Sequence, residues 1–388
     1  MLKLVKAAAG LLVTCISFMV FAGACGYRSS VPPPRPIPDV LPVLPPVQMV
    51  STEHTTMVIG TDGTLWGKGD NIRGELGDGT RTRQTFFDQV GHDDDWAWVS
   101  SGFWQTAAIK ADGSLWTWGS PQLTWIMFDH DLDNLLVPTQ VGNDYDWKMV
   151  SVGSGLLFAI KDDGTLWGMG TNQSGGLEMA DVNVRYSFVP IQLGNDSDWT
   201  QVFAARSRGY GVKADGSLWA WGVSISALPE HYELYRRAPE RIGSLNWFTL
   251  DFSNRHTLGI CSDGLLWAWG VNELGQLGDR THIGRDQNRP VQVGSYSDWV
   301  SIAAGSSFSL GVREDGSLWV WGWTTSLFFG GLAERDKTMP TQIHPYEQWA
   351  SVVAGGRNRA FAVTQDGRLM RLGTALLEEF PSIVSSSK

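Results

Sequence analysis

One short phrase occurs seven times in this chain: an Asp-Gly pair, one further residue, a leucine, usually a tryptophan, and a closing glycine. The first copy is TDGTLWGKG from Thr61, and the sixth is EDGSLWVWG from Glu314. A period of 48 to 52 residues, kept over most of the chain, predicts a repeat architecture in which each unit buries its apolar faces against its neighbours. The seven aspartates are Asp62, Asp112, Asp163, Asp215, Asp263, Asp315 and Asp366.

The sixth unit shows how each repeat folds. Its apolar runs predict strands at Trp299–Ala304, Phe308–Arg313 and Leu318–Trp321, and a fourth strand at about Pro340–Ile343. The Asp-Gly pair between the second and third strands predicts a two-residue hairpin turn with positive φ at both central residues.

The third strand is apolar on both of its faces. Leu318 and Trp319 point to opposite sides, and neither side is polar. A sheet without a wet face has to be sandwiched between neighbours, as a propeller blade is. The other units repeat the pattern, with a tryptophan opening the first strand at Trp96, Trp147, Trp199, Trp247, Trp299 and Trp349.

Two copies carry a family resemblance most clearly: residues 253–278 (SNRHTLGICSDGLLWAWGVNELGQLG) and residues 62–77 (DGTLWGKGDNIRGELG). The pattern resembles the regulator of chromosome condensation repeat family and runs from about Met49 to the C-terminus. The resemblance implies an all-β fold, a seven-bladed β-propeller of four-stranded blades. The founding member is a nucleotide exchange factor for a nuclear GTPase, and secreted bacterial relatives include an inhibitor of β-lactamases. No functional residue is carried over from either, because fold and function separate readily.

The N-terminus is typical of an exported protein. Residues 1–24 combine Lys3 and Lys6 with an apolar run and a small-residue end, which predicts a signal peptide. The stretch resembles a bacterial lipobox with Cys25 as the lipidated residue, although Ala22 stands where leucine is commonest. We therefore expect membrane anchoring through Cys25 in the bacterial cell envelope; plain secretion and an uncleaved anchor are the alternatives.

Residues 25–46 separate this segment from the repeats, which we assign to 47–388. The stretch 31–46 contains eight prolines, which predicts a semi-rigid spacer of roughly 50 Å at about 3.1 Å per residue. A disordered leader is the alternative. The three cysteines offer no disulfide framework, and Cys261, within a repeat strand, is interpreted as a small buried hydrophobe.

Charge and motif content exclude several function classes. The net charge is −10, which argues against nucleic acid as a partner, since that affinity comes largely from Lys and Arg. The chain shows no zinc-ligand spacing, nucleophile elbow or phosphate loop. We expect a non-enzymatic protein with no metal and no cofactor, and a monomer.

An up-and-down strand order separates two ends of the propeller. The turn face comprises the Asp-Gly turns and the links between blades, such as GHDDDW from Gly91 and GNDSDW from Gly194, and it is strongly acidic. Turn chemistry accounts for these residues; calcium or a basic partner is the alternative.

The loop face comprises the loops from first to second strand, nearest the axis, and those from third to fourth strand. The former carry arginines and aromatics, the residue types that dominate binding hot spots. Alternatively, the arginines cover exposed backbone and His256 fills a structural histidine position of the family. The candidates are His54, Phe103, Trp104, Arg206, Arg208, Arg255, His256, Arg357 and Arg359.

The loops from third to fourth strand vary most in the second, fourth and sixth units, where insertions replace the regular GxLGD. Loop variation on a rigid scaffold is where binding usually occurs, although these loops could also pack together as a lid. The candidate anchors are Trp125, Phe128, Tyr232, Tyr235, Phe328 and Phe329.

These features predict a cell-envelope scaffold that binds a protein, whose identity the sequence does not name, through its loop face. The alternatives are a secreted inhibitor resembling the β-lactamase inhibitors, and a propeller enzyme acting on a polysaccharide or small molecule. Exchange-factor activity is the least favoured, because a signal-bearing chain is in the wrong compartment.

Overall fold

The computed structural model describes residues 48–52, 54–120, 135–172, 176–177, 186–205, 208–222, 236–280, 286–323, 336–356, 359–372 and 378–379. All of them belong to one compact unit, Pro42–Lys388. Throughout these ranges the chain forms strands and turns, and no helix in them is long and apolar enough to cross a membrane.

Seven antiparallel blades follow one another, each with its strands in chain order from the innermost to the outermost. Blades 1 to 3 are β1 (Gln48–Ser51), β2 (Thr55–Ile59), β3 (Leu65–Gly69), β4 (Gln84–Gln89); β5 (Trp96–Ser101), β6 (Gln105–Lys110), β7 (Leu115–Gly119), β8 (Leu135–Gln140); and β9 (Trp147–Val152), β10 (Leu156–Lys161), β11 (Leu166–Thr171), β12 (Tyr186–Gln192). Blades 4 and 5 share β16: they are β13 (Trp199–Ala205), β14 (Arg208–Lys213), β15 (Ser217–Gly222), β16 (Arg236–Phe252), β17 (His256–Cys261), β18 (Leu266–Gly270) and β19 (Gln287–Gln292). Blades 6 and 7 are β20 (Trp299–Ala304), β21 (Phe308–Arg313), β22 (Leu318–Trp323), β23 (Asp336–Ile343); and β24 (Trp349–Gly355), β25 (Arg359–Thr364), β26 (Leu369–Leu372), β27 (Glu378–Glu379).

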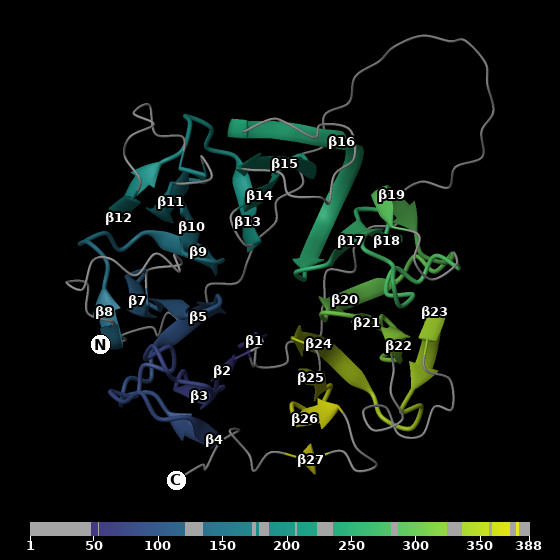
Figure 1. The fold of residues 1–388 in the computed structure, drawn as a ribbon, viewed down its shortest axis with the longest axis horizontal. Coiled ribbons are helices and arrows are strands. Elements are labelled where there is room, and N and C mark those ends of the chain that lie inside the picture. Colours follow the sequence, from purple (N-terminus) through teal and green to yellow (C-terminus); the bar gives the residue numbers. More distant parts are fainter. Residues whose placement is uncertain are drawn as a thin grey trace, which may run out of the picture. The chain divides into compact units, whose positions relative to one another are not determined.

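The innermost strands close a ring. Each contacts the innermost strand of the next blade, and β24 of blade 7 contacts β1 of blade 1 (Figure 1). The first and last blades therefore meet by packing, and each is built from one end of the described chain. This arrangement confirms the predicted all-β propeller of four-stranded blades.

The long strand β16 serves two blades. Its first part, Arg236–Ile242, pairs with β15, and its last part, Trp247–Phe252, pairs with β17. The linking residues Gly243–Asn246 lack the aspartates found in the other links, and the strand runs through them.

The Asp-Gly turn differs from the expected two-residue hairpin. In blade 2 the Lys110 amide donates to the Ser114 carbonyl at 3.1 Å, and the Gly113 amide donates back to Lys110 at 2.9 Å. The loop thus has three residues, and only Gly113 has positive φ, at +83°. The expectation of positive φ at both central residues was wrong, because the glycine follows the tight turn instead of lying inside it, as in a hairpin with a G1 bulge.

Side-chain hydrogen bonds explain the rest of the repeated phrase. Asp112 Oδ1 accepts from the Ser114 amide at 2.9 Å and from Ser114 Oγ at 2.6 Å. Ser114 Oγ in turn accepts from Trp116 Nε1 at 2.8 Å. In blade 2 the aspartate therefore organises its own turn and, through the hydroxyl, the tryptophan of the next strand. The same Trp-to-hydroxyl bond is formed by Trp66, Trp167, Trp219 and Trp319.

Blade 5 breaks this chain of bonds and provides a test. Leu265 stands where the hydroxyl residue is expected, and Trp267 Nε1, though buried, has no hydrogen-bond partner. We expect Leu265→Ser to be more stable than Leu265→Ala by about 0.5–1.5 kcal/mol, because only serine supplies the acceptor. Urea unfolding of the two variants measures the difference; equal midpoints would show that the hydroxyl contributes nothing.

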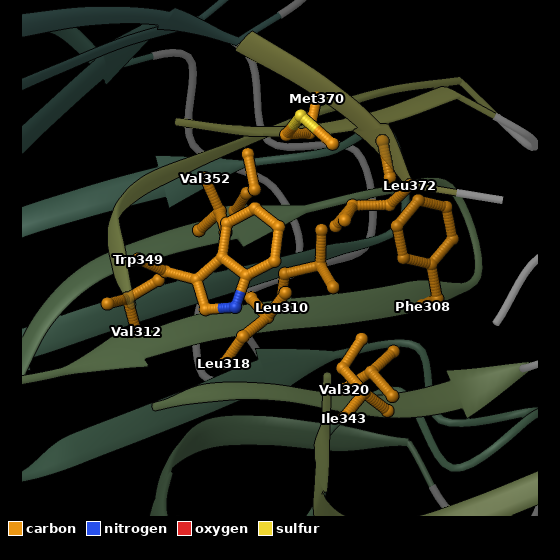
Figure 2. Packing of buried hydrophobic residues seen from close by; sticks show 13 residues of the cluster. Phe308, Leu310, Val312, Leu318, Val320, Ile343, Trp349, Val352, Met370 and Leu372 are labelled. Carbon is orange, nitrogen blue, oxygen red and sulfur yellow. The ribbon is translucent and has the colours of Figure 1, made fainter. Parts of the chain in front are cut away.

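The core lies between successive blades, as the two apolar faces of each strand predict. Figure 2 shows one such interface, where Leu310 and Val320 of blade 6 face Trp349, Val352 and Met370 of blade 7. Similar clusters join the other neighbouring blades, including the last to the first through Phe361 and Val58. Apolar packing therefore continues from blade to blade around the whole ring.

A buried cation joins the links to the strands. Lys161 Nζ lies 2.8 Å from Asp144 and 3.1 Å from Asp146, and 4.8 and 4.7 Å from the ring centroids of Trp147 and Trp167. Lys110, Lys213 and Arg313 occupy the same register in their blades. Many turn-face aspartates are therefore already paired within the fold.

In blade 5 the cation position is taken by Cys261, beside the link that lacks aspartates. The thiol is free and only 4% exposed, and burial raises its pKa to about 12. An uncharged thiol needs no carboxylates, so lysine and the aspartate pair are absent together.

Candidate functional site

The first-to-second-strand loops lie at the ends of the innermost strands, on the loop face. In blades 1, 2, 3, 5 and 6 the backbone of this loop is tied to the end of the third strand, as where the Asp70 amide donates to the His54 carbonyl at 2.8 Å. Seven predicted residues of this face are described: His54, Phe103, Trp104, Arg208, Arg255, His256 and Arg359. The other candidates lie outside the described residues: Cys25, Trp125, Phe128, Arg206, Tyr232, Tyr235, Phe328, Phe329 and Arg357.

Three of the described candidates form one aromatic cluster between blades 1 and 2. His54 stacks on Trp104 with ring centroids 4.6 Å apart and an interplanar angle of 23°. Phe103 meets the His54 ring edge-on at 4.6 Å and the Trp104 ring edge-on at 4.7 Å. All three side chains are half-buried, so each keeps part of its surface open.

Charged groups surround the histidine of this cluster. His54 Nδ1 lies 3.1 Å from Asp70 Oδ2, and Asp70 Oδ1 lies 3.3 Å from Arg83 Nε. Glu75 is 1% exposed; its Oε2 accepts from the Arg73 amide at 2.7 Å, and its Oε1 has no hydrogen-bond partner. Burial raises the pKa of Glu75.

Asp70, Glu75 and Arg83 are absent from the sequence-based prediction, because their loop was taken as the regular form of the repeat. A comparison of the two regular loops, in blades 1 and 5, could have identified the charged residues of blade 1. Blade 1 reads DNIRGELGD from Asp70, and blade 5 reads VNELGQLGD from Val271. Asp70, Arg73 and Glu75 of blade 1 thus replace a valine, a leucine and a glutamine, whereas Arg83 lies beyond this segment.

Arg359 opens β25 of blade 7 and is half-buried. Burial lowers the pKa of its guanidinium; Asp70 opposes this effect, while Arg83 and Arg371 add to it. Within the described ranges, Arg359 forms no ion pair and no side-chain hydrogen bond. It is therefore a partly desolvated cation without a matched anion.

The other two described loop-face arginines each have a contact within their own blade. Arg255 forms an ion pair with Glu273 of the neighbouring loop. Arg208 Nη1 lies 3.2 Å from the Tyr210 hydroxyl. Neither contact spans two blades, so these arginines do not join the cluster around His54.

His256 has the surroundings of a structural residue. It is 2% exposed, with Nδ1 3.0 Å from Ser253 Oγ and Nε2 2.7 Å from Ser309 Oγ of blade 6. These contacts favour the alternative interpretation, in which His256 connects blades, and we do not include it in the binding surface.

Burial lowers the pKa of His256 to about 3, which gives a pH dependence of stability. The unfolded histidine takes up its proton near pH 6.5 and the folded one only near pH 3, so stability present above pH 6.5 is lost as the pH falls. We expect His256→Gln to flatten the acid side of a stability-against-pH curve by up to about 1.4 kcal/mol per pH unit. His92, which is exposed, is the control: His92→Gln should leave the curve unchanged.

The turn face also exposes aromatic side chains that the sequence analysis did not single out. Tyr346 is 97% exposed and Tyr145 is 58% exposed, and both lie in links between blades. Within the described ranges, no group of three or more His, Cys, Asp or Glu side chains is placed to hold a metal ion.

Comparisons with known proteins agree with this architecture. Models of the regulator of chromosome condensation (RCC1) repeat match residues 263–312 and 299–326. The ultraviolet-B receptor UVR8 of Arabidopsis thaliana is 28% identical over 302 residues, covering 74% of this chain and 68% of the receptor. The regulator of chromosome condensation of Xenopus laevis is 24% identical over 316 residues, covering 73% of each protein.

Solved structures show the same fold. Human WBSCR16 superposes with a TM-score of 0.68 at 18% identity, covering 82% of this chain and 93% of that one. Yeast RCC1 (Prp20), in a complex with Kap60, gives a TM-score of 0.67 at 16% identity, covering 87% and 85%. Together with the seven repeats and the ring of blades, these matches support the regulator of chromosome condensation (RCC1) repeat family and show its β-propeller fold.

Proposed function

We propose that this protein is a non-enzymatic scaffold that binds another protein through its loop face. The observation that carries the proposal is the cluster of His54, Phe103 and Trp104, whose three half-buried rings contact one another on the loop face. Rigid aromatic side chains that keep part of their surface exposed are typical of interface hot spots. Relatives support a binding role only in outline: one is named a receptor, one a regulator, and the yeast relative is bound to Kap60.

Affinity capture from envelope extracts tests the proposal, using the full exported chain immobilised through its C-terminus. We expect Trp104→Ala to reduce the retained partner at least about tenfold, as the loss of a hot-spot aromatic would. Tyr346→Ala, an equally aromatic change on the turn face, is the matched control and should retain the partner. If Tyr346→Ala loses the partner and Trp104→Ala retains it, the interface lies on the turn face. A retained partner that is an enzyme, inhibited on binding, would make the scaffold an inhibitor.

We also propose that the protein is exported and tethered through Cys25, with residues 25–46 as a spacer between the membrane and the propeller. The support is the charged start, the apolar run and the lipobox-like end of the first 25 residues. Membrane fractionation of wild type and Cys25→Ser tests it, together with the mass of the mature N-terminus. Equal partitioning of the two proteins would contradict lipid anchoring.

A further inference from the structure

Each innermost strand from blade 2 to blade 7 begins with a β-bulge directly after its tryptophan. In blade 6 Trp299 pairs with Arg313 and Ser301 with Val312, so Val300 is the extra residue between them. A bulge takes its extra residue out of the ladder and re-aims the side chain. Because these strands start at the turn face, each bulge presents one residue there. The six residues are Ala97, Lys148, Thr200, Phe248, Val300 and Ala350.

Blades 5 and 6 place large apolar side chains at this bulge position. Phe248 is 49% exposed and Val300 is 37% exposed, and their strands β16 and β20 contact each other. Tyr296, in the link that enters blade 6, is 43% exposed. The alanines, lysine and threonine of the other blades show that the bulge itself requires no large apolar residue. Exposed apolar side chains gathered on neighbouring elements mark an interaction site.

These side chains are held in place by the surrounding structure. Gln201 Nε2 of blade 4 donates to the Phe248 carbonyl at 2.6 Å, which fixes the bulge of blade 5. The Tyr296 ring lies 3.8 Å from Arg313 Cζ, and its centroid is 5.4 Å from that of Trp319. Groups that are already ordered lose little conformational entropy when a partner binds.

Carboxylates border the apolar side chains. In blade 5 the Ser262 amide donates to the Asn246 carbonyl at 3.0 Å, two residues before Phe248, and blade 6 has the equivalent bond. The Asp-Gly turns of both blades therefore lie beside the bulges. Arg313 of this region is already paired with Asp298 at 2.7 Å. The exposed acids of the two turns are Asp263, Glu314 and Asp315. Charge complementarity therefore favours a basic partner.

We propose that Phe248, Val300 and Tyr296 form a second interaction surface, on the turn face, for a protein segment in which apolar residues alternate with lysines or arginines. The apolar side chains contact the bulge residues, and the cations face the bordering carboxylates. The protein's own spacer matches this chemistry poorly, because residues 31–46 contain one arginine and one aspartate and so have no excess of charge. This surface lies on the face opposite the proposed loop-face interface and does not rest on it.

Titration calorimetry of the full exported chain tests this chemistry with three defined peptides. The first is acetyl-Lys-Leu-Lys-Phe-Lys-Leu-Lys-amide. In the second, glutamine replaces every lysine, and in the third, serine replaces every leucine and phenylalanine. We expect the wild type to bind the first peptide about tenfold more tightly than either of the others, because the surface requires both the charge and the apolar groups.

Replacing the two bulge residues tests the location. Phe248→Thr combined with Val300→Thr should weaken binding of the first peptide about tenfold. Threonine is the residue that blade 4 already has at its bulge, Thr200, so the change suits the local backbone. Phe86→Thr removes a still more exposed phenylalanine from the outermost strand of blade 1 and is the matched control, which should bind like the wild type.

The acidic border is tested separately. Asp263→Asn keeps an oxygen that accepts from the Leu265 amide, a bond of 3.1 Å in the wild type, and removes only the charge. It should reduce the preference for the lysine peptide over the glutamine peptide. Asp112→Asn, the same change in the turn of blade 2, should leave that preference unchanged.

Several outcomes would overturn the inference. They are equal affinity of the wild type for all three peptides, unchanged affinity in the double bulge variant, and displacement of the first peptide by a synthetic copy of residues 31–46, which would assign the surface to the spacer. Displacement by phosphatidylcholine vesicles would assign it to a membrane. Should the double variant fail to fold, Phe248→Thr alone should still weaken binding. Trp104→Ala should bind the first peptide like the wild type, so the two surfaces can fail independently.

Discussion

Replacing Trp321 with alanine should lower the free energy of unfolding by about 3–5 kcal/mol. The side chain is 0% exposed and packs between blades 5 and 6, in a cluster with Leu277 and Trp299. A Cβ on Gly278 would lie 2.7 Å from its Cδ1 atom, so the ring lies directly against the backbone of the neighbouring blade. Neither blade can collapse into the space without losing strand pairing. Urea or guanidinium unfolding of the exported chain measures the loss.

Tyr346→Ala is the control for this measurement. Tyr346 is 97% exposed, and its removal should change stability by no more than about 0.5 kcal/mol. Trp319, half-buried in the same strand and bonded to Ser317 Oγ at 2.7 Å, should give an intermediate loss on replacement by alanine. A loss at Trp321 no greater than that at Trp319 would refute the view that the contacts between blades dominate stability.

Gly113→Ala should destabilise the protein more than the same change at Gly367, although both glycines hold the same place in the repeat. Their φ angles are +83° and +88°, so each substitution incurs about 1–2 kcal/mol of left-handed strain. A Cβ on Gly113 would also lie 2.2 Å from the Tyr145 carbonyl oxygen in the link to the next blade. A Cβ on Gly367 would meet nothing within 4 Å. Forcing the link away should add about 1–3 kcal/mol at Gly113 alone.

Gly113 differs from Gly367 because it lies against the link between blades 2 and 3. The Gly113 carbonyl accepts from the Trp147 amide of blade 3 at 3.1 Å, so displacing the link also weakens this bond. Parallel denaturant titrations of the two alanine variants compare the effects with the backbone strain held constant. Equal destabilisation would mean that the turn glycines are required only for their φ, and that the joint tolerates displacement.

The sequence predicts the strands of this protein better than its turns and loops. In blade 6 the predicted Trp299–Ala304 and Phe308–Arg313 coincide with β20 and β21, because strands buried on both faces form apolar runs that end at turn residues. The turn was predicted less well, since Asp-Gly is compatible with two hairpin types and only the backbone hydrogen bonds distinguish them.

The sequence predicted which residue types form the candidate site, but not which of the predicted residues come together in it. His54, Phe103 and Trp104 were among the predicted residues, and the structure brings them into contact. Arg255 belonged to the same prediction, yet it pairs with Glu273 in its own blade. The sequence shows which loops carry arginine; it does not show which arginine finds an anion, because the partner comes from a different loop.

By itself, the sequence determined the repeat, the strand pattern within it and the division into a turn face and a loop face, because each follows from local periodicity. The tertiary structure alone decided that blades 1 and 7 meet through β1 and β24, and that Asp70 and Arg83 of blade 1 act electrostatically on Arg359 of blade 7. The physical reason is distance along the chain. Ring closure places residues from opposite ends of the propeller side by side, and the charge balance at such a seam depends on both ends at once.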